Sequence, residues 1–242
     1  MPVITPRHLL WMRRSVRAVP RLRHCWPTGG NLLVMKPDRP LWHAWWAEGR
    51  PGSFSSDGFM AAMAEWVSQK GHSGPEPSRK MAEYTALNAV RMRRVAKTHV
   101  MSPEMQHLLD SGACDGQHWV IITESWCGDG AQTTPIIRKL AERAGVPVYW
   151  VLRDSGTTII DDFLINGGRS VPIWVVADGG GQVLGHWGPR PSTAAAMAAE
   201  YRSAPQPRED YGAFSTRLQL WYARNRGKEF EQEALDMLLG IA

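Results

Sequence analysis

The order of apolar segments between residues 117 and 203 most strongly constrains the fold of this chain. Short β-branched runs, which suit buried strands, alternate there with longer stretches of helical periodicity. We expect strands at 119–123, 146–152, 173–177 and 182–187, and helices at 130–144, 157–165 and 192–202. Three glycines follow Asp178 between the last two strands, which is a hairpin signal. One crossover followed by a hairpin predicts an α/β protein with a mixed central sheet and helices on both faces.

The segments outside this core are less regular. Residues 1–56 are rich in Pro, Gly and Arg without sustained periodicity, so we expect a disordered basic extension there. Residues 57–80 read as a helix followed by a linker of turn-forming residues. Residues 81–242 are expected to form one domain, with the core at 117–203 and extra N- and C-terminal helices at about 81–109 and 211–239 packed on it.

The charge of the chain lies mostly in its first segment. Formal net charge is +5, but residues 1–37 hold seven of the 28 basic side chains and no acid, which leaves 21 against 23 in the remainder. The body therefore has no basic excess for a nucleic acid or a membrane surface, and no run approaches the ~20 apolar residues of a membrane span. Three scattered cysteines (Cys25, Cys114 and Cys127) do not make a disulfide framework. We expect a reducing, cytoplasmic setting.

Cys127 lies at a position in the chain that favours a reactive thiolate. The segment Glu124-Ser-Trp-Cys-Gly-Asp-Gly-Ala-Gln132 joins the end of the first strand to the start of the helix that follows. Unpaired amide N–H groups and the positive end of the helix dipole both favour a thiolate there. Cys127 is therefore the candidate nucleophile.

The motifs around Cys127 resemble those of thioredoxins. Trp126-Cys127-Gly128 is similar to the start of their Trp-Cys-Gly-Pro-Cys signature, and Pro135 falls at their helix-kinking proline. Val171-Pro172 has the spacing of their cis-proline loop, and Gly188 matches the glycine after their hairpin.

The flanking pieces Tyr84-Thr-Ala-Leu-Asn88 and Arg91-Met92 look like a bacterial group called "thioredoxin family protein". The resemblance implies a thioredoxin-like fold with Cys127 as its reactive residue. It also implies a site shaped by the neighbours of that cysteine and by a cis-proline groove: Trp126, Gly128, Asp129, Gly130, Val171 and Pro172.

The departures from that family matter as much as the matches. Asp129 and Gly130 stand where thioredoxins carry Pro and the second Cys, and Ile121 replaces their buried acid. Cys114 should lie on the order of 20 Å from Cys127 across an extended strand, too far for a disulfide; Cys25 could reach in principle. Asp129 should raise the thiol pKa while the helix dipole lowers it, and the sequence leaves the net direction open. We expect Asp129 to favour the helix start and Glu124 to be solvated.

These observations predict a monothiol protein, a thiol–disulfide oxidoreductase that lacks the resolving cysteine. Its expected partners are proteins or low-molecular-weight thiols and disulfides. The alternative is a redox-inactive thioredoxin-fold binding module. A third idea, an iron–sulfur site shared by two chains, is disfavoured because Asp129 would repel a thiolate-ligated cluster. We expect no cofactor and no metal, since the histidines at 99, 107, 118 and 186 share no ligand spacing.

Overall fold

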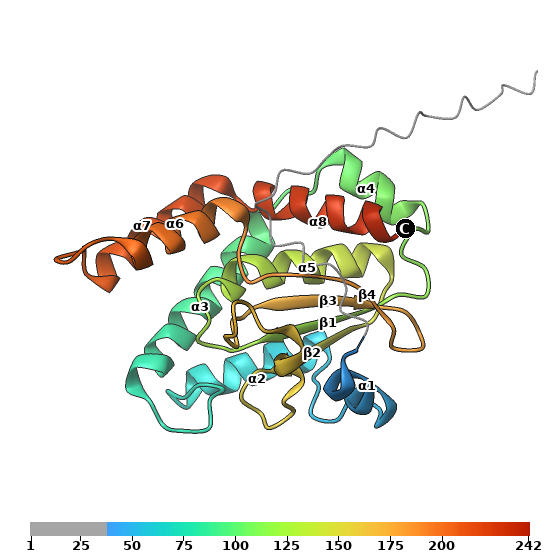
Figure 1. Cartoon of the computed structure of the whole chain (residues 1–242), viewed down its shortest axis with the longest axis horizontal. Helices are drawn as coiled ribbons and strands as arrows, with labels where there is room; N and C mark the ends of the chain where they lie inside the picture. The colour runs from blue at the N-terminus through green and yellow to red at the C-terminus, as the bar shows by residue number, and fades with distance from the viewer. Residues whose placement is uncertain (1–37) are drawn as a thin grey trace, which may run out of the picture.

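A four-stranded mixed sheet forms the centre of the computed structural model, which describes residues 38–242 (Figure 1). The strand order is β2-β1-β3-β4. β1 (His118–Thr123) pairs parallel with β2 (Val148–Leu152) and antiparallel with β3 (Ile173–Ala177), which pairs antiparallel with β4 (Val183–Trp187). The expected crossover and hairpin are confirmed, and so is the α/β class.

Helices pack around this sheet, and apart from the first helix and a 3₁₀ turn their bounds lie close to those expected from the sequence. They are α1 (Pro40–Ala47), α2 (Ser56–Ser68), α3 (Arg79–Thr98), α4 (Pro103–Asp110), α5 (Gly130–Ala144), the 3₁₀ turn η1 (Ile159–Phe163), α6 (Ser192–Ser203), α7 (Tyr211–Asn225) and α8 (Lys228–Ile241). The segment expected to be a helix at 157–165 is the short 3₁₀ turn. Gly227, at φ +80°, separates α7 from α8 as its position in the sequence indicates.

The alternating residues of β1 bury two separate cores. Trp119 and Ile121 face the core that α3, α5 and α8 cover, whereas Val120 and Ile122 face the core that contains the tryptophans of α1. Figure 1 shows α5 and α1 on opposite sides of the sheet. Apolar residues of α3, α4 and α8 belong to the first of these two cores.

Residues 38–56 are ordered, and the expectation of disorder is wrong for them. α1 buries Trp42, Trp45 and Trp46 on one side, because positions i, i+3 and i+4 share a helix face. Trp42 Nε1 donates a 2.7 Å hydrogen bond to the carbonyl oxygen of Gly181 in the hairpin. Because Pro and Gly flank these tryptophans, the composition of residues 1–56 indicates disorder although this short stretch is helical. Residues 1–37, with Cys25 and most of the expected basic extension, lie outside the described residues.

A second contact anchors this segment to the edge of the sheet. Phe54 forms an antiparallel bridge with Trp150 of β2, with N–H···O distances of 2.8 Å in both directions. The edge strand β2 is therefore partly covered, which limits pairing with another chain.

α6 and α7 form a helical pair that extends beyond the edge of the sheet (Figure 1). The pair has a small core of its own, in which Phe214 and Leu218 of α7 pack against Ala194 and Ala198 of α6. Residues of both helices line the same cleft as Cys127. Among residues 38–242, no helix has both the length and the apolar character needed to cross a bilayer.

Candidate functional site

Cys127 lies in the turn between β1 and α5, against the loop that precedes β3. Its Sγ accepts a hydrogen bond from the Gly130 N–H and donates one to the Val171 carbonyl oxygen, both at 3.3 Å. The Val171–Pro172 peptide bond is cis, as the resemblance to the thioredoxin cis-proline loop implies. The structure therefore brings together the cysteine and the cis-proline loop that the sequence analysis paired.

Two glycines keep this arrangement close-packed. A Cβ added to Gly188, whose φ is +139°, would lie 2.2 Å from the Pro172 carbonyl oxygen. A Cβ added to Gly130 would lie 2.6 Å from Thr123 Oγ1. The position at which thioredoxins carry their second cysteine is thus closed by Thr123 at the end of β1.

Polar residues from α3 and the loop before it fix the backbone that leads to Cys127. Ser125 exchanges hydrogen bonds with Ser73, each 2.9 Å from backbone N to hydroxyl oxygen. The Ser125 hydroxyl also lies 2.8 Å from Thr85 Oγ1, and the Asn88 side chain donates to the Ser125 carbonyl oxygen at 3.0 Å. This gives a physical role to the segment 84–88, which the sequence analysis noted only as a resemblance.

Glu124 is buried, so the expectation that it is solvated is wrong. Its carboxylate accepts hydrogen bonds from the Ser73 hydroxyl and from the Asp154 N–H, the latter at 2.9 Å. Burial raises the pKa of Glu124 above its ordinary value, although these two hydrogen bonds oppose the shift. Glu124 thus links the 73 loop, β1 and the end of β2.

Asp129 is also buried, and its side chain does not cap α5. One carboxylate oxygen accepts a 2.9 Å hydrogen bond from the Tyr222 hydroxyl of α7, and the other lies 2.6 Å from Arg190 Nη2. The expectation that Asp129 favours the helix start misses this pairing, because both partners come from segments far along the chain. Neither Arg190 nor Tyr222 has a local sequence signal that could have identified it.

The environment of Cys127 decides the direction that the sequence left open. Burial and then the Asp129 carboxylate raise the pKa of the Cys127 thiol to about 12, against the opposing effects of the Gly130 N–H and Arg190. The pKa-lowering effect of the helix N-terminus is therefore outweighed in the folded protein. At neutral pH, Cys127 is a neutral thiol that donates a hydrogen bond to the Val171 carbonyl oxygen.

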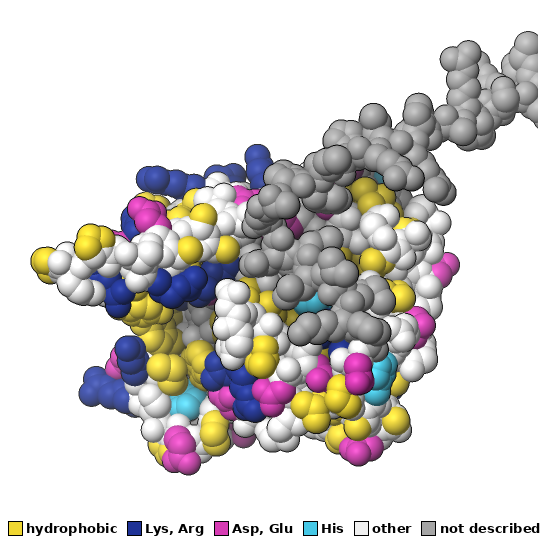
Figure 2. All heavy atoms as spheres, viewed as in Figure 1, with side chains coloured by type: hydrophobic (Ala, Val, Ile, Leu, Met, Phe, Trp, Pro, Cys, Tyr) yellow, Lys and Arg dark blue, Asp and Glu magenta, His cyan; other side chains and the backbone are white. Residues whose placement is uncertain are grey.

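A cleft of about 600 Å³ opens over this thiol. Cys127, Trp126 and Gly128 lie on one side of it, and α3, α6 and α7 supply its walls. Its described lining includes five cations and one acid, Asp129; the cations are Lys80, Arg91, Arg153, Arg190 and Arg202. Figure 2 shows the hollow between the α6–α7 pair and the start of α3, with hydrophobic side chains inside and Lys or Arg on both rims.

Aromatic side chains contribute much of the remaining lining of this cleft. They are Tyr84, Trp126, Tyr201, Tyr211 and Phe214. The guanidinium of Arg153 lies 4.8 Å from the centre of the Trp126 ring, which positions Trp126 as a wall beside the thiol.

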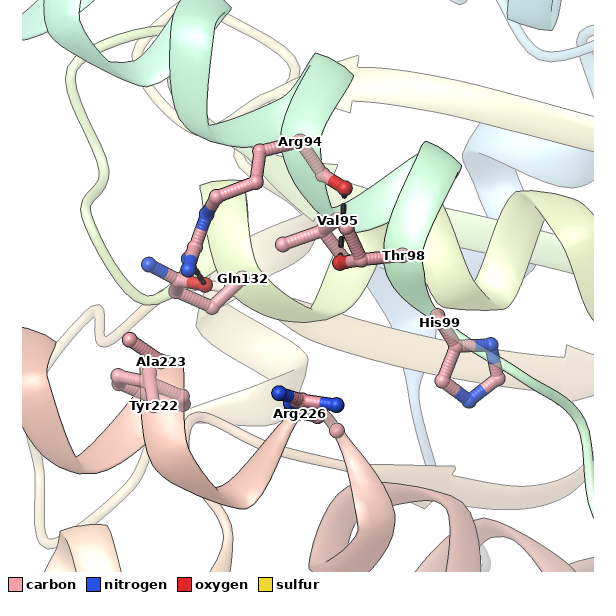
Figure 3. Close-up of a pocket in the computed structure, with 9 residues that line it drawn as sticks. Arg94, Val95, Thr98, His99, Gln132, Tyr222, Ala223 and Arg226 are labelled. Carbon is pink, nitrogen blue, oxygen red and sulfur yellow. Dashed lines mark hydrogen bonds between the residues drawn. The ribbon is translucent and has the colours of Figure 1, made fainter.

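A smaller pocket of about 280 Å³ lies between α3, α5 and the α7–α8 junction (Figure 3). Arg94 donates a 3.0 Å hydrogen bond to Gln132 at one side, and Arg226 and His99 lie at the other. His99 Nε2 lies 2.5 Å from a buried oxygen of Glu231. Because Cys127 does not line this pocket, we assign the candidate site to the larger cleft.

Cys114 does not contribute to the site. It packs in the core that contains Trp119, on the opposite face of the sheet from the core that contains Cys127, and both are free thiols within the described residues. Residues 38–242 also contain no group of three or more His, Cys, Asp or Glu side chains that could hold a metal.

A central mixed sheet with a cysteine at the start of α5 facing a cis-proline loop defines the thioredoxin-like class of proteins. The family model described as "Thioredoxin" matches residues 74–202, and this chain belongs to that family. No curated protein matches the chain. An HIV epitope scaffold and a protein of unknown function from Pseudomonas aeruginosa each have a similar solved structure. In both cases the match covers 78% of this chain at 13% identity and a TM-score of 0.46, with 100% and 99% of those chains covered.

Proposed function

We propose that this thioredoxin-family protein forms mixed disulfides through a single cysteine, Cys127. The observation that carries the proposal is the placement of the Cys127 sulfur 3.3 Å from the Val171 carbonyl, on the inner side of an open cleft. A disulfide that enters the cleft would meet this sulfur beside the cis-proline loop. Trp126, Gly128, Asp129, Gly130, Val171 and Pro172 shape the site in this proposal.

The exchange needs no second cysteine in the protein. The Cys127 thiol first loses its proton to solvent, and the thiolate attacks one sulfur of a disulfide R–S–S–R′. A bond forms between Cys127 and the R-bearing sulfur as the S–S bond breaks, and R′–S⁻ leaves. An external thiol then attacks the mixed disulfide and returns Cys127 to its thiol form.

The high pKa makes the resting protein a slow reagent. With a pKa of about 12, roughly one thiol in 10⁵ is ionised at pH 7. Thiolate nucleophilicity rises with pKa and recovers part of this loss. We therefore expect mixed disulfides that form slowly and, once formed, persist until a thiol is supplied.

The proposal includes the setting of the reaction. Low-molecular-weight or protein thiols and disulfides are the expected partners, in a reducing cytoplasm of a bacterial type of cell, and neither nucleic acid nor membrane takes part. Balanced charge in the body of the chain supports the exclusion of a nucleic acid.

Mass spectrometry tests the proposal directly. Folded protein that carries Cys25→Ser and Cys114→Ala is incubated with excess glutathione disulfide at pH 8.5. We expect a mass increase that corresponds to one glutathionyl group, which maps to Cys127 and is removed by dithiothreitol. The matched Cys127→Ser protein should show none. No adduct on folded protein, with full modification in urea, would reject the proposal.

One observation favours the alternative, a redox-inactive binding module. Burial and the pKa of about 12 protect the Cys127 thiol, and Thr123 occupies the space that a resolving cysteine would need. In this alternative the cleft binds its ligand without covalent chemistry. Ligand capture that is equal for the wild-type and Cys127→Ser proteins would support it.

A further inference from the structure

The cations of the cleft differ in how they are neutralised. Arg153 lies 2.6 Å from Asp154, and Arg190 lies 2.6 Å from Asp129. Within residues 38–242, no carboxylate lies within ion-pair distance of Lys80, Arg91 or Arg202. Three of the five cations in the cleft lining thus have no ion-pair partner among residues 38–242.

These three cations come from two walls of the cleft. Lys80 and Arg91 are on α3, at its start and in its second half, and Arg202 is at the end of α6. Arg91 is close to the thiol: its Nη1 lies 3.5 Å from the position of a Cβ built on Gly128, the residue after Cys127. The chain therefore directs unpaired positive charge from two sides towards the space above Cys127.

Three cations without ion-pair partners give this part of the cleft a net positive charge. Half-burial lowers the pKa of Arg91 and repulsion from Arg94 acts in the same direction, against the opposing effects of Tyr84 and Asp129. An incoming anion would relieve this repulsion, and in a partly desolvated cleft the attraction is stronger than at an open surface. The aromatic lining offers a flat apolar surface for the body of the same ligand.

The volume of the cleft limits the size of the ligand. A space of about 600 Å³ is typical of sites for small molecules. A folded protein could reach Cys127 only through a segment thin enough to enter between α3 and the α6–α7 pair. Size and charge together therefore favour a small anion over a protein surface.

We infer that the cleft selects small disulfides and thiols that carry at least two negative charges, binding them through Lys80, Arg91 and Arg202 with the reacting sulfur next to Cys127. The inference rests on the proposed function and names its substrate class. The charges could be carboxylates or phosphates, since guanidinium and ammonium groups bind both.

A series of disulfides that differ in charge tests this selectivity. The second-order rate of Cys127 modification is measured in the Cys25→Ser, Cys114→Ala protein with dianionic 5,5′-dithiobis(2-nitrobenzoate), neutral 2-hydroxyethyl disulfide and dicationic cystamine. Each rate is divided by the rate for the same protein unfolded in urea. We expect a normalised preference for the dianion over the dication of about tenfold or more, which decreases as NaCl is added. Equal normalised rates would overturn the inference.

Charge-neutral variants locate the effect. The triple variant Lys80→Gln, Arg91→Gln, Arg202→Gln should lose the preference for the dianion over the dication, measured as the ratio of the two normalised rates in the same variant. Lys97→Gln is the matched control, because Lys97 is an exposed cation on the same helix that does not line the cleft. A triple variant that keeps the preference would contradict the assignment of these residues.

A binding experiment separates failure of this inference from failure of the proposed function. In Cys127→Ser protein no exchange can occur, and calorimetric titration with benzene-1,3,5-tricarboxylate and with pyrophosphate measures anion binding alone. We expect at least one to bind with a Kd below about 1 mM and about tenfold more weakly to the triple variant; the stronger ligand tells carboxylate from phosphate preference. Binding of neither below about 10 mM would overturn the inference, whether or not Cys127 reacts.

Discussion

The Tyr222 hydroxyl donates a 2.9 Å hydrogen bond to the Asp129 carboxylate, across 93 residues of sequence. This bond joins α7 to the turn that carries Cys127, so the C-terminal helices form part of the site rather than an appendage. Arg190 pairs with the other carboxylate oxygen of Asp129. The carboxylate that raises the pKa of Cys127 is therefore held in place by two residues outside the motif.

Replacement of Asp129 should make Cys127 more acidic. Asp129→Asn removes the second largest cause of the raised pKa and leaves Arg190 without its partner beside the thiol. We expect the apparent pKa of Cys127 to fall by about one unit or more, measured by the pH dependence of iodoacetamide alkylation in the Cys25→Ser, Cys114→Ala background. Asp115→Asn, an exposed acid near Cys114, is the control. An unchanged or higher pKa in Asp129→Asn would contradict this electrostatic account.

Loss of the Tyr222 hydroxyl should destabilise the domain. Tyr222→Phe keeps the buried ring but leaves a buried carboxylate with one hydrogen-bond partner fewer. We expect a loss of about 1.5–3 kcal/mol in the free energy of unfolding, measured by urea denaturation. Tyr201→Phe serves as the comparison, because the Tyr201 ring stacks on Phe214 and its hydroxyl has no partner within the described residues. Equal stabilities of the two variants would count against the Asp129 network.

The size of residue 130 should be coupled to residue 123. Gly130→Ala places a Cβ 2.6 Å from Thr123 Oγ1, which is too close for an unstrained contact, and we expect a loss of about 1–3 kcal/mol in stability. Thr123→Ala removes that oxygen, so the double variant should recover much of the loss. A double-mutant cycle of unfolding free energies measures the coupling. Additive effects would show that Thr123 does not close this position.

Stability should fall as pH falls from 6.5 towards 4, in part through His186. Burial, followed by the charge of Arg39, lowers the pKa of His186 to about 4. The unfolded chain binds the proton near pH 6.5, so the contribution of this group is fully present above that pH and is lost as pH falls through the window. We expect His186→Asn to reduce the fall by about 2.5 kcal/mol, measured by urea denaturation at pH 7.5 and 4.5. The control variant His107→Asn, at an exposed position, should lose as much stability between the two pH values as the wild type. The same loss in His186→Asn as in the wild type would contradict the prediction.

The sequence predicted the sheet and the site turn because their signals are local. The β-branched runs of β1 and β3 and the spacing from Cys127 to Pro172 require nothing from distant residues. α1 was missed because Pro and Gly surround a single turn of tryptophans that gains its stability only by packing on the sheet. A propensity argument does not register that kind of stabilisation.

The electrostatics of the site could not be read from the sequence for a related reason. Whether the pKa of Cys127 is raised or lowered depends on burial of the thiol and on the position of the Asp129 carboxylate. Hydrogen bonding to Tyr222 and the ion pair with Arg190 hold that carboxylate in place. The buried position of Glu124 depends likewise on Ser73 in a distant loop. Helix-dipole reasoning at the motif alone predicts a more acidic thiol than the folded protein has.

The central claim is that Cys127 forms mixed disulfides from a buried, neutral resting state. The most direct test is the pH dependence of mixed-disulfide formation at Cys127 with 5,5′-dithiobis(2-nitrobenzoate) in the Cys25→Ser, Cys114→Ala protein between pH 6 and 10. We predict a rate that rises about tenfold per pH unit without a plateau, because the thiol pKa of about 12 lies above the range. A plateau below pH 8.5, or no adduct on the folded protein at any pH, would contradict the account.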